Sequence, residues 1–137
     1  MPNRTIVSRL VSLMCLLRER AKTIPTSRSF SVMHMQALHF IRVQDGCLMH
    51  DVAKYLAIKP PSATALVAHL IGRNLVKREV DAGDRRVIRL RATPAGRRLL
   101  AKRFDEFSRA MDGVLKRLTV EETQELIILL DRILSQK

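Results

Sequence analysis

The sequence predicts a mainly α-helical protein with one short β-hairpin. Apolar residues recur at helical spacing along most of the 137 residues and alternate with polar ones only between residues 76 and 91. Thr93-Pro94 and Thr119-x-x-Glu122 follow this alternating stretch, and both are helix-start signals. The length suits one core, so we expect a single domain over residues 1–137.

The first predicted helix is unusually apolar. Apolar side chains at 6, 7, 10, 13, 14 and 17 form one helical face, and Val11, Cys15 and Leu16 widen it. Such a terminal helix needs a second surface to cover it, and a partner subunit would supply one. Pro25 and the serines around it predict a loop.

The middle of the chain predicts a helix-turn-helix. Helices are expected over residues 32–43, 51–57 and about 61–73, and the two Pro residues after Lys59 separate the last two. Their core-facing residues are expected to be Val52, Ala53, Leu56, Ala63, Leu66, Val67 and Leu70.

A basic hairpin follows directly. Residues 76–81 and 87–91 read as strands joined through residues 82–86, which makes a wing behind the helix-turn-helix. Thr93 then caps a helix running to about residue 116. Thr119 opens the last helix, whose apolar stripe is Leu126, Ile127, Leu130, Ile133 and Leu134. The predicted fold class is therefore a winged helix-turn-helix flanked by terminal helices.

Positive charge is concentrated in this middle region. The chain has 25 Lys and Arg against 13 Asp and Glu, with a net charge of +10 between Lys54 and Arg103 and −2 from residue 104 onward. This distribution favours a surface that faces a polyanion, and a generally basic soluble surface is the alternative. No apolar run approaches the ~20 residues that span a membrane, so we expect no membrane partner and a cytoplasmic location.

These residues resemble the MarR-type (multiple-antibiotic-resistance) regulators over about residues 30–134. The resemblance rests on Asp51-Val52-Ala53-Lys54-Tyr55-Leu56, Ala63-Thr64-Ala65-Leu66-Val67, Leu70, Asn74-Leu75-Val76-Lys77-Arg78, Asp81, Asp84-Arg85-Arg86, Leu90 and Thr93-Pro94-Ala95-Gly96. The wing pattern followed by the Thr-Pro-x-Gly helix start is the most specific part.

The resemblance implies a homodimer that binds double-stranded DNA at a near-palindromic operator and represses transcription. Dimerisation helices would span about residues 3–22 and 94–135, and the winged helix-turn-helix about residues 32–92. Each recognition helix would enter a major groove and each wing a minor groove. Many members release DNA on binding a small molecule, so a small-molecule effector is expected.

The sequence departs from the family pattern at four places. Asn74 replaces the usual Gly after the recognition helix, and Asn also tolerates a left-handed cap. Leu48 and Lys59-Pro60 replace polar helix caps, so the helix after Leu48 should fray slightly. Small residues stand at outward positions of the recognition helix where relatives carry long polar ones: Ala65, Ala68 and Gly72.

Candidate DNA-binding residues lie on this helix and on the wing. Ser62, Thr64 and His69 are expected on the outer helix face, with helix capping and a hydrogen bond to its own backbone as the alternatives for Ser62 and Thr64. Asp84 is expected to support the wing, and of Arg85 and Arg86 the latter is the preferred groove contact. Candidates for contacts to the DNA backbone are Arg73, Lys77, Arg78 and Arg89.

The remaining reactive side chains predict little chemistry. His34 and His39 are interpreted as core or surface histidines, and neither Cys15 nor Cys47 as the main redox switch. No constellation supports catalysis, a metal site or a cofactor. Besides the regulator, the sparse outer face of the recognition helix leaves a winged-helix protein-interaction or assembly module as the alternative function.

Overall fold

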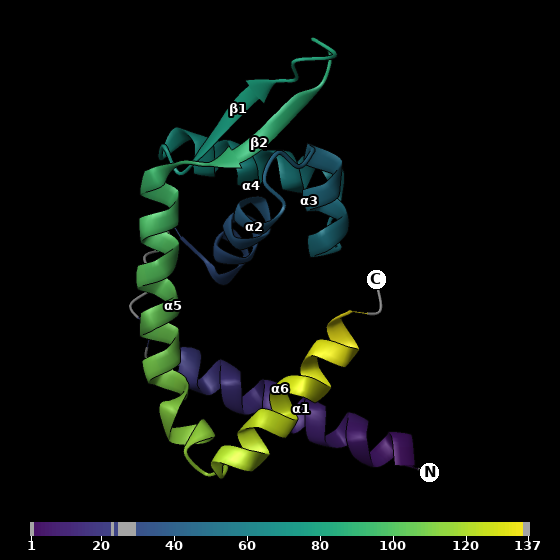
Figure 1. Ribbon diagram of the computed structural model, residues 1–137, viewed down its shortest axis with the longest axis vertical. Helices are drawn as coiled ribbons and strands as arrows, with labels where there is room; N and C mark the ends of the chain where they lie inside the picture. The colour runs from purple at the N-terminus through teal and green to yellow at the C-terminus, as the bar shows by residue number, and fades with distance from the viewer. Residues whose placement is uncertain (1, 23, 25–29, 136–137) are drawn as a thin grey trace. The chain divides into compact units, whose positions relative to one another are not determined.

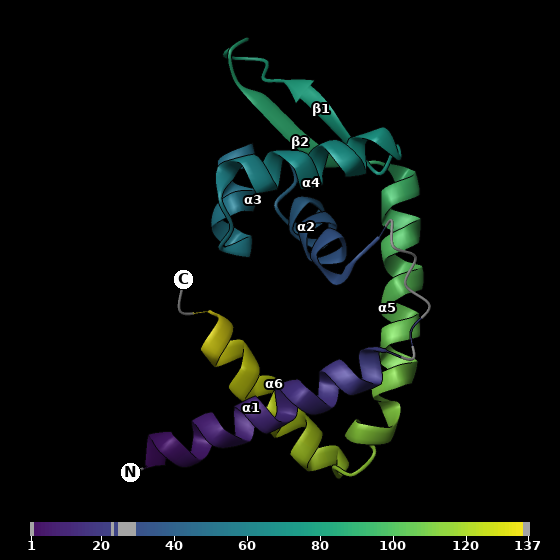
Figure 2. The same ribbon diagram turned by 180° about the vertical axis from the view of Figure 1, so that it is seen from behind.

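The computed structural model describes residues 2–22, 24 and 30–135, and it has six helices and one hairpin in these ranges (Figures 1 and 2). The loop expected around Pro25 lies outside the described residues. The elements, in chain order, are α1 (Pro2–Ala21), α2 (Val32–Val43), α3 (Met49–Leu56), α4 (Pro60–Gly72), β1 (Val76–Val80), β2 (Ile88–Ala92), α5 (Pro94–Leu115) and α6 (Val120–Leu134). The predicted fold class is confirmed.

The chain divides into two compact units. Residues 26–105 form one, which holds α2, α3, α4, the hairpin and the start of α5. Residues 1–25 and 106–137 form the other, which holds α1, the end of α5 and α6. The expected extents of the winged region and the dimerisation helices stay predictions.

The first unit, called the winged unit below, is built around a small aliphatic core. α2 contributes Ala37, Leu38 and Ile41, all fully buried, and α3 contributes Val52 and Ala53. Ala63, Val67 and Leu70 cover the inner face of α4, at the 3.6-residue spacing of one helix side. Leu56 and Leu66, expected in the core, are partly buried at its edge.

The hairpin is a two-stranded antiparallel sheet in which Val76 pairs with Ala92 and Val80 with Ile88. Val76, Leu90 and Ala92 face the core, whereas Val80 is exposed near the turn. The base of the sheet is therefore anchored, and its far end projects into solvent (Figure 1).

The helix ends explain the element boundaries. α3 begins at Met49, earlier than the expected residue 51, because the Asp51 carboxylate accepts the Leu48 N–H at 2.8 Å and replaces the missing cap. Asn74 has φ +58°, which confirms the left-handed cap after α4. Thr119 and Glu122 form the expected capping box of α6.

The second unit exposes most of its apolar side chains. None of the residues of α6 is buried, and along α1 the side chains of Leu10 and Met14 are 52% and 62% exposed. No helix in the described part of the chain is long and apolar enough to cross a membrane.

Candidate nucleic-acid interface

The outer face of α4 is short of long polar side chains. Ser62, Thr64, Ala65 and Ala68 are exposed on it, opposite the buried Val67. The helix begins with Lys59 as N-cap, without a side-chain cap, and with Pro60 at its first position. Ser62 therefore lies inside the first turn and is not the N-cap, so helix capping, the alternative role considered for its hydroxyl, does not apply.

The Thr64 hydroxyl already has a partner in its own helix. It donates to the Pro60 carbonyl at 3.0 Å, one turn earlier, which is the backbone hydrogen bond considered as its alternative role. Its oxygen lone pairs still face solvent and can accept a hydrogen bond. A DNA contact by Thr64 stays a prediction, and in this contact its hydroxyl oxygen would accept a hydrogen bond from a base.

The position expected for His69 is wrong. Its ring is partly buried against α2, with its centroid 4.6 Å from that of His34, and its Nδ1 is buried without a hydrogen-bond partner. Helical spacing placed His69 on the outer face of α4. Because the last turn of α4 packs on α2, this position faces the neighbouring helix instead of solvent. Arg73, one turn later, is exposed, and its guanidinium carbon lies 5.8 Å from the centroid of the Phe30 ring.

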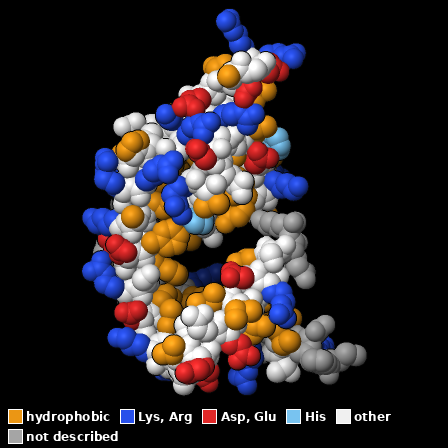
Figure 3. All heavy atoms as spheres, viewed as in Figure 1, with side chains coloured by type: hydrophobic (Ala, Val, Ile, Leu, Met, Phe, Trp, Pro, Cys, Tyr) orange, Lys and Arg blue, Asp and Glu red, His pale blue; other side chains and the backbone are white. Residues whose placement is uncertain are grey.

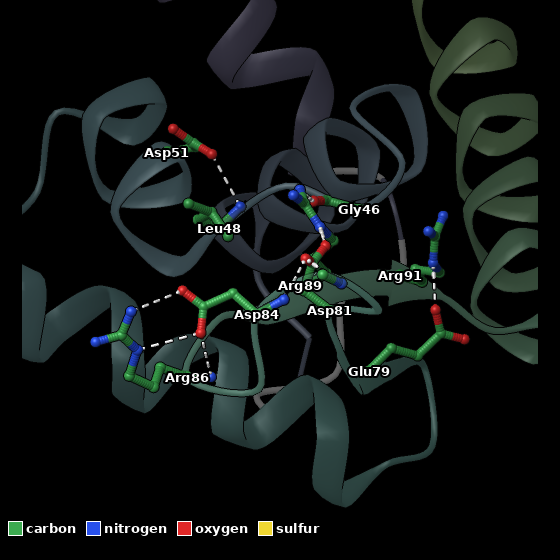
Figure 4. A network of polar contacts seen from close by, with 10 residues as sticks. Gly46, Leu48, Asp51, Glu79, Asp81, Asp84, Arg86, Arg89 and Arg91 are labelled. Atoms are coloured by element: carbon green, nitrogen blue, oxygen red, sulfur yellow. Dashed lines mark hydrogen bonds and ion pairs between the residues drawn. The ribbon is translucent and has the colours of Figure 1, made fainter.

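Asp84 supports the wing through Arg86. The Asp84 carboxylate accepts hydrogen bonds from the Arg86 backbone N–H at 3.0 Å and from its Nε and Nη2 at 3.2 Å each (Figure 4). These bonds hold the pKa of Asp84 below its ordinary value. The Arg86 side chain is nonetheless 91% exposed, so the pair presents the guanidinium to solvent in a fixed orientation.

A second carboxylate organises the base of the same loop. Asp81 accepts the backbone N–H groups of Gly83 and Asp84 at 3.0 and 3.1 Å, and it also pairs with Arg89. Arg89 reaches further and donates to the Gly46 carbonyl at 2.9 Å (Figure 4). Hydrogen bonds from Arg89 and Gly83 keep the pKa of Asp81 low. Arg89 therefore stabilises the hairpin, a role that sequence reasoning did not assign to it.

Arg91 has a similar role and was not predicted as a site residue. It pairs with Glu79 on the neighbouring strand and, through Nη1, with Asp45 at 2.7 Å. Lys77 shares the Glu79 carboxylate at 2.8 Å, and these partners lower the pKa of Glu79. The alternation of Arg89 and Arg91 along β2 showed that they share a face, but no local pattern indicated that residues 45–46 lie across from them.

Two arginines of the hairpin are left without such a partner. The side chains of Arg78 and Arg85 are exposed and make no hydrogen bond or ion pair with any described residue. Basic side chains also gather at the projecting end of the hairpin in the space-filling view (Figure 3). The hairpin therefore combines oriented, paired arginines with unpaired ones, a pattern suited to phosphate and groove contacts.

Histidine and cysteine side chains do not form a reactive centre. His39 packs edge-on against Phe104, with 5.3 Å between the ring centroids. Burial raises the pKa of the Cys47 thiol to about 11, whereas Cys15 is exposed on α1. In the described part of the chain, no three His, Cys, Asp or Glu side chains are grouped as a metal site would need.

Comparison with known proteins agrees with this geometry. Residues 29–87 match the sequence model of the MarR family. The chain is 23% identical over 96 residues to a protein of Bacillus subtilis (strain 168) described as the uncharacterized HTH-type transcriptional regulator YwhA. The aligned region covers 70% of this chain and 69% of that protein.

Two solved structures share the fold at low identity. BldR from Sulfolobus solfataricus, a transcriptional regulator, has a TM-score of 0.76 at 22% identity, covering 99% of this chain and 96% of its own. BpsR from Bordetella bronchiseptica, whose DNA binding is regulated by 6-hydroxynicotinic acid, has a TM-score of 0.70 at 23% identity, covering 96% and 94%. The chain is therefore similar to the MarR family over residues 29–87, and it has the winged helix-turn-helix fold that these two structures share.

Proposed function

We propose that this protein is a DNA-binding transcription regulator, a repressor that acts as a homodimer. The observation that carries the proposal is the basic hairpin beside α4, where Arg85 is unpaired and Asp84 orients Arg86 toward solvent. In this arrangement α4 enters a major groove and the hairpin follows the neighbouring minor groove. With few polar groups on α4, phosphate contact and groove shape supply more of the affinity than base hydrogen bonds.

The exposed apolar faces of α1 and α6 support the homodimer. Ile6, Leu10 and Met14 are more than half exposed on α1, as are Ile133 and Leu134 on α6. Soluble proteins rarely leave such faces in water, and a second copy of the chain would bury them. A two-fold dimer would then favour a near-palindromic site with half-sites about one helical turn, ~10 bp, apart.

A hollow on the winged unit supports control by a small anion. It has a volume of about 210 Å³ and is lined by Arg42, Arg97, Leu100, Ala101 and Phe104. The side chains of Arg42 and Arg97 form no hydrogen bond or ion pair with a described residue, and Leu100 and Phe104 supply an apolar wall. Two guanidiniums beside an aromatic ring suit a planar carboxylate, the class to which the ligand of BpsR belongs.

The alternative function is a protein-interaction module with little DNA binding. It is favoured by the outer face of α4, where Ala65 and Ala68 are exposed, Thr64 is bonded to its own helix and His69 is turned toward α2. The wing is evidence against this alternative, because unpaired arginines on a projecting hairpin are suited to phosphate contacts.

The test is a binding titration against a duplex selected from a random library and a scrambled duplex of equal length. A DNA-binding regulator should prefer the selected duplex and lose affinity steeply as NaCl rises from 50 to 200 mM. An interaction module should select no duplex. For the ligand, 6-hydroxynicotinate should weaken binding of the wild type, and Arg42→Gln with Arg97→Gln should remove that effect.

A further inference from the structure

Two histidine rings from different helices meet beside the start of α2. His34 lies in the first turn of α2 and His69 in the last turn of α4, with ring centroids 4.6 Å apart and planes at 53°. Phe30, only 2% exposed, stacks on His34 with 5.9 Å between the centroids. The contact therefore joins α2 to the helix proposed to read DNA, at the edge of the core.

His34 also caps its own helix. The Ser31 backbone N–H donates to His34 Nδ1 at 3.1 Å, the Ser31 hydroxyl lies 2.8 Å from the same atom, and the His34 N–H donates to that hydroxyl at 3.4 Å. This is a capping box in which His replaces the usual Glu or Gln. Nδ1 can accept the N–H only while it carries no proton, so the box requires the neutral ring with its proton on Nε2.

The charged groups around His34 all oppose its protonation. Burial, His69 and Arg73 lower the pKa of His34, and the latter two come from α4. From α5, the guanidinium carbon of Arg103 lies 5.8 Å from the Phe30 ring centroid, as does that of Arg73. The amino end of α2 adds a partial positive charge of its own. No carboxylate among the described residues contributes to the pKa of His34.

We propose that the His34–His69 contact is a proton-sensitive joint between α2 and α4, closed while the His34 ring is neutral and opened by acid. A proton on His34 Nδ1 would face the Ser31 N–H, break the capping box, and place a positive charge beside His69 and Arg73. The first turn of α2 would then separate from the last turn of α4.

The consequence for DNA binding rests on the proposed function. The direction in which DNA affinity changes with acid distinguishes the joint from a simple gain of charge. Protonating histidines adds positive charge, which by itself strengthens binding to any duplex. Opening the joint displaces α4, so binding to a preferred sequence should weaken in acid. The two effects have opposite signs and can be separated by experiment.

The pH range follows from linkage. A histidine in the unfolded chain titrates near ~6.5, and the pKa of His34 is lower in the folded protein. Between about pH 6.5 and the lower pKa of folded His34, the unfolded state binds more protons. The stability from this contact is therefore complete above about pH 6.5 and is lost as pH falls toward and through the folded pKa. His39 contributes in the same direction, because burial and Arg42 lower its pKa as well.

His34→Gln is the informative variant, because a Gln amide oxygen accepts the same N–H and does not titrate. We would compare urea midpoints at pH 7.5 and 5.5 for the wild type, His34→Gln and His39→Gln. The fall in midpoint should be smaller in His34→Gln than in the wild type. An equal fall in His34→Gln and the wild type would overturn the joint, as would NMR showing that folded His34 titrates like a histidine in a short peptide.

The second arm measures binding to a duplex selected from a random library, at both pH values and constant ionic strength. We expect the wild type to lose at least about threefold in affinity at pH 5.5, whereas His34→Gln holds or gains affinity. If the wild type tightens as much as His34→Gln, the joint does not act on α4 and the proposal is wrong. If no duplex can be selected, the proposed function fails, and the urea and NMR measurements still decide the joint.

Discussion

The Thr93 hydroxyl donates a hydrogen bond of 2.6 Å to the Asn74 carbonyl and so joins the end of β2 to the end of α4. The same oxygen accepts the Gly96 N–H at 3.0 Å and caps α5. The Thr93 N–H donates to the Leu75 carbonyl at 3.0 Å. One residue thus fixes three elements, and the position of the hairpin beside α4 depends on this junction.

Gly96 should not tolerate a side chain at this junction. A Cβ placed on it would lie 2.1 Å from the Leu75 carbonyl oxygen, so backbone has to move. We expect Gly96→Ala to lower the free energy of unfolding by about 3 kcal/mol, the range for strained, overpacked sites. Urea denaturation measures it. Gly72→Ala is the matched control, because no atom lies within 4 Å of its added Cβ. It should be neutral or slightly stabilising, and equal losses in both variants would contradict the steric account.

The local patterns in the sequence were sufficient to predict the helices and strands of the winged unit. Helical spacing placed α2 at residues 32–43, as observed, and the alternating residues placed both strands to within a residue. Asn74 was expected to keep the left-handed turn and has a positive φ. These features depend on residues close in sequence, whose chemistry is visible without a structure.

Contacts between distant segments were not predictable in this way. Arg89 was expected to contact the DNA backbone and Arg91 had no expected role, because nothing local places Gly46 and Asp45 beside them. His69 fits an outward helical position, and only the packing of α4 on α2 brings it to His34. Long-range packing therefore decided which polar side chains support the fold.

The apolar faces of α1 and α6 should be required for the dimer. Leu130 and Leu134 are 46% and 70% exposed in the single chain, so Leu130→Asp with Leu134→Asp costs little in a monomer. In a dimer the same change buries unpaired charge, and the protein should become monomeric or unfold. Sedimentation measures this. Glu121→Gln with Glu125→Gln, on the same helix, should stay dimeric. A dimeric Leu130/Leu134 variant would contradict the assignment.

Thiol oxidation should not be the main switch. Because the pKa of Cys47 is raised to about 11, this group is almost entirely in the unreactive thiol form at neutral pH. Iodoacetamide at pH 7.5 should modify exposed Cys15 first and Cys47 only after urea is added, as read by mass spectrometry. Peroxide should change DNA affinity by less than about threefold. A larger loss that reductant restores, and that Cys15→Ser lacks, would show that Cys15 is a sensor.

Thr64 should affect sequence discrimination rather than overall affinity. Its hydroxyl proton is used by Pro60, which leaves an acceptor facing outward. Thr64→Ala should reduce the preference for the selected duplex by about 1 kcal/mol and leave the salt dependence unchanged. Ala68→Ser, which adds a hydroxyl one turn later, is the matched control for helix integrity. If Thr64→Ala lost equal affinity for the selected and the scrambled duplex, Thr64 would not contact a base, and the prediction would be wrong.

The most direct test of DNA binding through the wing is the salt slope of the arginine variants. Affinities of the wild type, Arg85→Ala, Arg86→Ala and the control Lys116→Ala, from the other compact unit, would be measured between 50 and 200 mM NaCl. The wild type should show a steep linear fall of log affinity with log salt, and each wing variant should bind every duplex more weakly with a slope flatter by about one unit. Lys116→Ala should match the wild type. If both wing variants bound all duplexes as tightly as the wild type, with the same slope, the hairpin would not be the DNA contact.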